Sequence, residues 1–98
     1  MSNFKLTISN ISTDPTALAD GILENYGEDF DAARGDFITS VEGDSVEVFA
    51  IDVTKGDVRT LVEDIYRDFG DEDDTLLIRA SKQDGSNWFP TDYLEDDE

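Results

Sequence analysis

The sequence contains no cysteine and no histidine. The lack of cysteine excludes a disulfide framework and any zinc or iron–sulfur site with cysteine ligands. The lack of histidine removes the side chain that most often serves as a general base and as a transition-metal ligand. Both absences count against a catalytic or metal-dependent function.

Basic residues are scarce, since seven Lys and Arg stand against 25 Asp and Glu, for a formal net charge of −18. No apolar run approaches the ~18 residues of a membrane span. Residues 1–10 also lack the basic start and apolar stretch of a signal peptide. An acidic surface is repelled by anionic lipid headgroups. We therefore expect a cytoplasmic protein that binds neither membranes nor nucleic acid directly.

The motifs of common enzyme classes are missing as well. Carboxylate pairs serve glycoside cleavage, but among 25 acidic residues some pair falls at any chosen distance. No Gly-x-Ser-x-Gly elbow and no glycine-rich phosphate loop occurs. The acidic run at 71–74 lacks the Asp-x-Asp-x-Asp-Gly pattern of a calcium loop. The sequence therefore predicts no enzyme, no cofactor and no metal site.

Enough apolar sequence is present, 38% of the residues, for one folded domain. Alternating patterns predict strands at 4–11, 37–42, 46–53 and 75–81, with a short returning strand at 87–89 that Pro90 ends. Helical spacing predicts a first helix from Pro15 until Gly27 and a second between Thr54 and Gly70. Residues 28–36 connect the first helix to the next strand, with one helical turn around Phe30 and Ala33.

The order β-α-β-β-α-β-β is typical of a split βαβ arrangement. We expect an α+β fold, with an antiparallel sheet of four to five strands and both helices on one face. The strand at 46–53 has apolar residues on both faces, which predicts a central position. Trp88 and Phe89 are expected to cover the sheet edge or the helix packing, with a partner contact as the alternative. Residues 1–90 then form a single domain, and residues 91–98 form an acidic, flexible tail.

The acidic residues follow the polar faces of the predicted helices. Like charges at i, i+4 spacing destabilise a helix by a few tenths of a kcal/mol, so interspersed Lys and Arg would cost less. A solvated face therefore explains why these positions are polar but not why they share one sign of charge. The residues predicted to contact a partner are Asp20, Glu24, Glu28, Asp29, Asp31, Asp57, Glu63, Asp64, Asp68, Asp71, Glu72, Asp73 and Asp74.

The density of these charges permits mimicry of DNA. A folded protein of this mass exposes roughly 5,600 Å², which leaves about one acid per 220 Å² if the acids are spread evenly. Duplex DNA carries roughly one charge per 110 Å² of its cylindrical surface. Acids gathered onto about half of the surface would match the charge density of a duplex. Only clustering of the acids in the folded protein would therefore establish DNA mimicry.

In size, charge and lack of catalytic residues, the whole chain resembles the small acidic DNA-mimic inhibitors of phages and mobile elements. These include anti-restriction and anti-CRISPR proteins and uracil-glycosylase inhibitors. The likeness is one of gross character and involves no alignable motif. It implies a protein of the host cytoplasm that occupies the basic nucleic-acid-binding site of a host defence or DNA-processing protein and inhibits it.

Two other functions fit the sequence. One is an ordinary protein of a high-salt cytoplasm, which agrees with 17 Asp against 8 Glu and only three Lys. The other is an acidic adaptor or regulatory subunit that recognises its partner through the sheet edge or the Trp88–Tyr93 region. The target, the acids in contact and the oligomeric state, including a possible homodimer, stay open.

Overall fold

The computed structural model describes residues 2–70 and 75–91, which form five strands and two α-helices. The predicted α+β fold is confirmed. The strands are β1 (Ser2–Ser9), β2 (Phe37–Glu42), β3 (Ser45–Val53), β4 (Leu77–Asp84) and β5 (Asn87–Thr91). The helices are α1 (Pro15–Tyr26) and α2 (Lys55–Phe69), with a short 3₁₀ turn, η1 (Ala32–Arg34), between α1 and β2.

Both helices begin at the residues that the sequence indicates. Asp14 is the N-cap of α1 and accepts a hydrogen bond from the Thr16 N–H at 3.1 Å, with Pro15 in the first helical position. Thr54 and Asp57 form the capping box of α2, in which each backbone N–H donates to the other side chain at 3.1 Å. The cap holds the Asp57 carboxylate at the first turn of α2.

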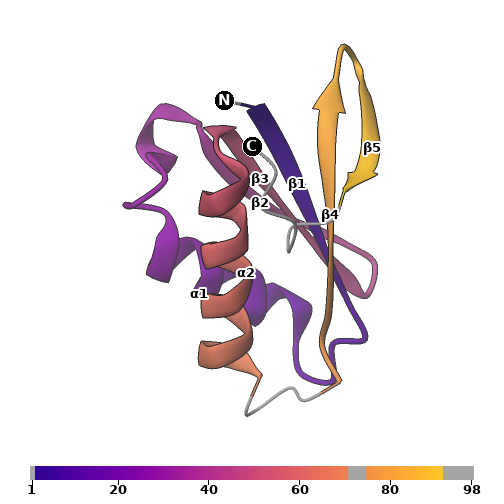
Figure 1. Cartoon of the computed structure of the whole chain (residues 1–98). Coiled ribbons are helices and arrows are strands. Elements are labelled where there is room, and N and C mark those ends of the chain that lie inside the picture. The colour runs from indigo at the N-terminus through magenta and orange to yellow at the C-terminus, as the bar shows by residue number, and fades with distance from the viewer. Residues whose placement is uncertain (1, 71–74, 92–98) are drawn as a thin grey trace.

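The strand order is β2-β3-β1-β4-β5, and every neighbouring pair is antiparallel. Strands β1 and β2 therefore run parallel with β3 between them, which is the predicted split βαβ arrangement. Strand β3 lies inside the sheet as expected, although β1 holds the centre. Figure 1 shows both helices on one face of the sheet.

The hydrophobic core lies between that face and the helices. Strand β1 contributes Phe4, Leu6 and Ile8, each no more than 1% exposed. The other buried strand residues include Val46, Val48, Ala50, Phe37, Ile78 and Ala80, and the helices add Leu18, Ala19, Ile22, Tyr26, Val58, Leu61, Val62 and Ile65. The apolar residues of the alternating strand patterns and of the helical patterns thus pack into one core. Within the described residues, no helix is both long and apolar enough to cross a membrane.

The C-terminal hairpin extends further than predicted. Pro90 pairs with Ser81, and Thr91 pairs with Ala80, so the prediction that Pro90 ends the pairing is wrong. Proline has no N–H to donate, but it is tolerated here because β5 is an edge strand. Thr91 accordingly belongs to the sheet, and the rest of the predicted tail lies outside the described residues.

No described element covers the second face of the sheet, which we call the open face. The strand registers place the charged residues Lys5, Glu42, Glu47 and Arg79 there. The Trp88 ring packs edge-on against Phe49 with 5.8 Å between centroids, and the Lys5 Nζ lies 5.4 Å from the Trp88 centroid. Trp88 is half-buried on this face, and Phe89 is 51% exposed, so neither belongs to the core.

Candidate acidic binding site

Six aspartates line a pocket of about 470 Å³, which we call the acidic pocket. Its wall is formed by the segment between α1 and β2, the end of β3 and the first turns of α2. Arg34 is the one basic residue in the lining, so the lining carries a net charge of −5. The six acids are Asp29, Asp31, Asp36, Asp52, Asp57 and Asp64.

The segment between α1 and β2 supplies three of these acids. The Phe30 ring stacks on the Phe37 ring with 5.3 Å between centroids, and this contact ties the segment to the start of β2. The Ala32 N–H donates to the Gly27 carbonyl at 2.7 Å, and the Gly35 N–H donates to the Ala32 carbonyl at 2.9 Å. The expected helical turn near Phe30 and Ala33 is therefore the 3₁₀ turn η1.

Asp52 reaches the pocket because β3 contains a bulge. Ser2 pairs with Val53 but Phe4 pairs with Ala50, so one extra residue stands in β3. Strict alternation would place residue 52 on the core face with Ala50. The bulge instead buries Val53 and leaves Asp52 exposed with φ at 59°, its N–H donating to the Asn3 Oδ1 at 2.9 Å. The bulge thus brings Val53 into the core together with Ala50.

The pocket aspartates differ in their partners. The Asp57 carboxylate caps α2, and the Asp64 Oδ1 lies 3.0 Å from the Arg67 Nη1. Within residues 2–70 and 75–91, no ion pair or hydrogen bond engages the carboxylate of Asp29, Asp36 or Asp52. Uncompensated carboxylates that share one pocket create a negative potential, which attracts a cationic group. No cluster of three described carboxylates is arranged to coordinate a metal ion.

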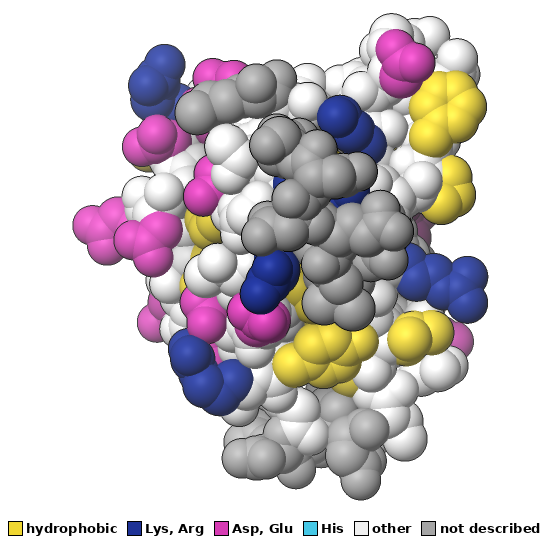
Figure 2. Space-filling model, viewed as in Figure 1, with side chains coloured by type: hydrophobic (Ala, Val, Ile, Leu, Met, Phe, Trp, Pro, Cys, Tyr) yellow, Lys and Arg dark blue, Asp and Glu magenta, His cyan; other side chains and the backbone are white. Residues whose placement is uncertain are grey.

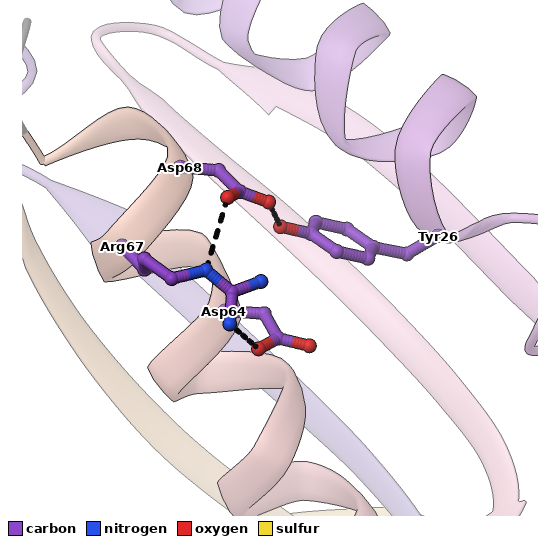
Figure 3. A network of polar contacts seen from close by, with 4 residues as sticks. All are labelled: Tyr26, Asp64, Arg67 and Asp68. Carbon is purple, nitrogen blue, oxygen red and sulfur yellow. Dashed lines mark hydrogen bonds and ion pairs between the residues drawn. The ribbon is translucent and has the colours of Figure 1, made fainter.

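A polar network joins α1 to α2 beside the pocket (Figure 3). The Tyr26 hydroxyl donates to the Asp68 Oδ2 at 2.5 Å, and the Arg67 Nε donates to the Asp68 Oδ1 at 3.3 Å. Burial, together with the carboxylate of Asp68, raises the pKa of Tyr26. The hydrogen bond from Tyr26, assisted by Arg67, lowers the pKa of Asp68. Asp68 therefore has a structural role in holding the helices together.

Replacing Tyr26 by Phe should lower the midpoint of urea unfolding at neutral pH, because the charge-assisted hydrogen bond to Asp68 is lost. The folded pKa of Asp68 is lowered, so its contribution to stability is present above the unfolded pKa of about 3.9 and is lost as the pH falls through the folded value. The difference in unfolding midpoint between wild type and Tyr26→Phe should therefore become smaller as the pH falls from neutral into acid. Urea titrations at a series of pH values measure this difference.

The matched control is Tyr66→Phe. The Tyr66 hydroxyl accepts a hydrogen bond from the Ile78 N–H at 2.9 Å, and neither of these two groups is a carboxylate. Its loss should lower stability by a similar amount at every pH tested. A Tyr26→Phe gap that stays constant from neutral pH into acid would contradict the role assigned to Asp68.

The structure brings together only part of the predicted acidic set. Asp29, Asp31, Asp57 and Asp64 line the acidic pocket. Asp20, Glu24 and Glu63 lie exposed on the helices outside its lining. Glu28 lies in the wall of a second groove, beside β2, and Asp68 is held by Tyr26 and Arg67. Asp71, Glu72, Asp73 and Asp74 lie outside the described residues.

Sequence reasoning missed Asp36 and Asp52, which also line the pocket. Asp36 directly precedes β2, and its carbonyl accepts the Ile51 N–H at 2.9 Å, which brings it beside the end of β3. Asp52 interrupts an apolar run at the end of β3. Strict alternation from Val48 and Ala50 would place Asp52 on the core face, and a charge at a core-facing position is a signal that could have pointed to a bulge there.

Among residues 2–70 and 75–91, the acid excess is concentrated on the helical side of the sheet. Segments 14–36 and 52–70, which contain the helices and the loops at their ends, hold twelve acidic and four basic residues, a net charge of −8. The described strand residues of the open face include two acidic and two basic residues, a net charge of zero. In Figure 2, acidic side chains gather on the side where Figure 1 places the segment between α1 and β2. The two faces of the sheet thus differ strongly in charge.

Replacing Asp52 by Gly should stabilise the protein by about 0.5–1 kcal/mol, because a left-handed backbone is strained for a residue with a Cβ. Asp52→Asn removes the same charge but keeps the side chain, so it should raise the melting temperature less. Thermal unfolding of both variants in one buffer checks this. Equal shifts for Gly and Asn would show that charge repulsion, rather than backbone strain, limits stability at this position.

Comparison with known proteins identifies no relative, since no protein-family model, curated protein or solved structure matches this chain. The function is therefore argued from the charge distribution, the acidic pocket and the edges of the sheet.

Proposed function

We propose that the protein is a DNA mimic that binds the basic nucleic-acid-binding site of a host defence or DNA-processing protein and inhibits it. The observation that carries this proposal is the acidic pocket, in which five of six aspartates have no cationic partner among the described residues. The pocket lies on the helical side, and the charged residues that the described strands place on the open face sum to zero.

The supported mimicry is local. Averaged over half of the 5755 Å² surface, the twelve acids of the helical segments amount to about one per 240 Å², which is sparser than the charges of a duplex. The pocket instead gathers six carboxylates around about 470 Å³. A few Lys or Arg side chains of the partner that normally bind consecutive phosphates would bind carboxylate oxygens in this pocket instead.

The lining suits arginine in particular. A guanidinium group binds a carboxylate through two parallel hydrogen bonds, and its alkyl stem packs against aromatic rings. Tyr26 and Phe30 stand in the wall beside the aspartates. Long-range attraction between the acidic side and a basic partner would speed association and make it sensitive to salt. Occupation of the partner's groove then excludes DNA.

The charge-balanced open face argues against adaptation to high salt as the main cause of the acidity. Such adaptation acts on the whole exposed surface, because every part of it meets the same solvent. The open face, however, has Lys5 and Arg79 to match Glu42 and Glu47. A surface with one acidic side and one neutral side is the pattern expected of a directed electrostatic interface.

A column experiment tests the proposal. The protein is immobilised, a nuclease-treated lysate is applied at low salt, and retained proteins are eluted either with a salt gradient or with duplex DNA. We expect retained nucleic-acid-binding proteins to be released by both, because DNA competes for the same basic groove. Inhibition is then measured as loss of DNA binding by the purified partner.

A column carrying an Asp29→Asn, Asp36→Asn and Asp52→Asn variant is the control. It should release the same partners at lower salt. Partners that DNA does not displace, and that elute at the same salt from both columns, would contradict DNA mimicry and favour the adaptor alternative.

A further inference from the structure

Strand β2 is an edge of the sheet that lacks the usual protection against pairing. The opposite edge, β5, contains Pro90. Strand β2 has no proline and no lysine, and its one charged residue is Glu42 at its end. Ile38 and Val41 are 48% and 39% exposed. This edge is therefore suited to accept another strand.

The hairpin register identifies the free backbone groups of β2. Gly43 and Asp44 form a two-residue turn, so Glu42 and Ser45 are the closing hydrogen-bonded pair. Hydrogen-bonded pairs recur at every second residue, so Ile38 and Ser40 also direct their N–H and C=O groups toward β3. Thr39 and Val41 consequently direct theirs away from the sheet, where an added strand would bind them.

An apolar groove of about 670 Å³ lies beside this edge, between β2 and the end of α1. Its wall includes Leu23, Ala33 and Phe37 together with two acids, Glu28 and Asp31. Leu23 is 39% exposed. Because Asp31 lines both this groove and the acidic pocket, the two sites are contiguous.

We propose that the edge of β2 binds an extended segment of the cationic partner as a sixth strand. Its backbone pairs with Thr39 and Val41, an apolar side chain enters the groove, and neighbouring Lys or Arg side chains lie near Glu28 and Asp31. Backbone pairing supplies affinity in this mode, and pockets for alternate side chains supply specificity. The inference rests on the proposed function, which supplies the cationic partner.

Charge decides against a second copy of the chain as the occupant. Another copy would bring a further net charge of −18 toward the acids of the groove. Self-repulsion of this size keeps proteins apart. A segment that alternates apolar and basic residues satisfies the apolar wall and the acidic wall together.

Two synthetic ten-residue peptides of equal charge test the proposal, one alternating Lys and Val and the other alternating Lys and Ser. We expect the Lys–Val peptide to bind about tenfold more tightly. It should also slow hydrogen exchange of the Thr39 and Val41 amides, measured by NMR. The Thr39→Pro variant should lose this preference, because the outward N–H of residue 39 is gone while the ladder to β3 is kept.

Leu23→Gln is the second variant, and it alters the groove without touching the strand. It should also reduce the preference for the Lys–Val peptide, and it therefore provides the test if Thr39→Pro fails to fold. Equal, salt-sensitive binding of both peptides without amide protection would overturn strand addition and leave the proposed function standing. If neither peptide binds at low salt, both strand addition and the proposed function are contradicted. If sedimentation shows that the wild-type protein is a dimer and that Thr39→Pro is a monomer, the edge of β2 binds a second copy and the proposal is overturned.

Discussion

Replacing Asp29, Asp36 and Asp52 together with Asn should weaken binding of the basic partner about 100-fold at low salt. An exposed charge pair changes an equilibrium by up to about fivefold, and three replaced carboxylates multiply that effect. None of the three engages a cation or caps a helix among the described residues, so the fold should tolerate the change. Asp31 is retained because it also lines the groove beside β2.

Titration calorimetry at low and high salt measures the effect. Wild type and variant should converge at high salt, because screening removes the advantage of the carboxylates. The matched control is Asp44→Asn, Glu47→Gln and Asp84→Asn, three residues outside the pocket, and both triple variants raise the net charge by three, from −18 to −15. An equal loss of affinity in both would mean that overall charge, rather than the pocket, attracts the partner.

Replacing Phe37 by Ala should destabilise the protein by about 3–5 kcal/mol, which is the cost typical of removing a buried phenylalanine ring. Phe37 is 2% exposed at the start of β2, and its ring stacks on Phe30. The substitution opens a cavity in the core and also releases the segment that presents Asp29 and Asp31. A loss of this size is a large part of the 5–15 kcal/mol that ordinarily separates folded from unfolded states.

Urea unfolding measures this loss, with Ile38→Ala as the neighbouring control. Ile38 is 48% exposed, so its truncation should cost less than about 1 kcal/mol. If Phe37→Ala is unfolded in water, Phe37→Leu should still fold, with a smaller loss of about 1–2 kcal/mol. Similar losses for Phe37→Ala and Ile38→Ala would contradict the packing described for the start of β2.

Local patterns predicted most of the fold, because each depends on residues close together in the chain. The Thr54–Asp57 capping box and the Asp14-Pro15 start are such patterns, and both are present. The turn at Gly43 and Asp44 is another. The split βαβ order followed from the sequence of these elements, since few arrangements of two helices and an antiparallel sheet bury one face of each.

The candidate site was predicted less well. Helical spacing pointed to Asp57 and Asp64, but it gave equal weight to Asp20, Glu24 and Glu63, which lie outside the pocket. Asp52 was missed because its position depends on a bulge that sets β3 against β1. The role of Asp68 depends on Tyr26, which is 42 residues away in the chain.

The amino-acid order alone settled the sign and size of the net charge, the elements and their capping residues, because these depend on composition and on neighbours along the chain. Tertiary structure decided which carboxylates share a pocket, which edge strand lies open and which face of the sheet stays neutral. Those properties depend on distances between segments that are separated in sequence. The packing of β1, β3, α2 and the connector sets these distances, and no local pattern encodes them.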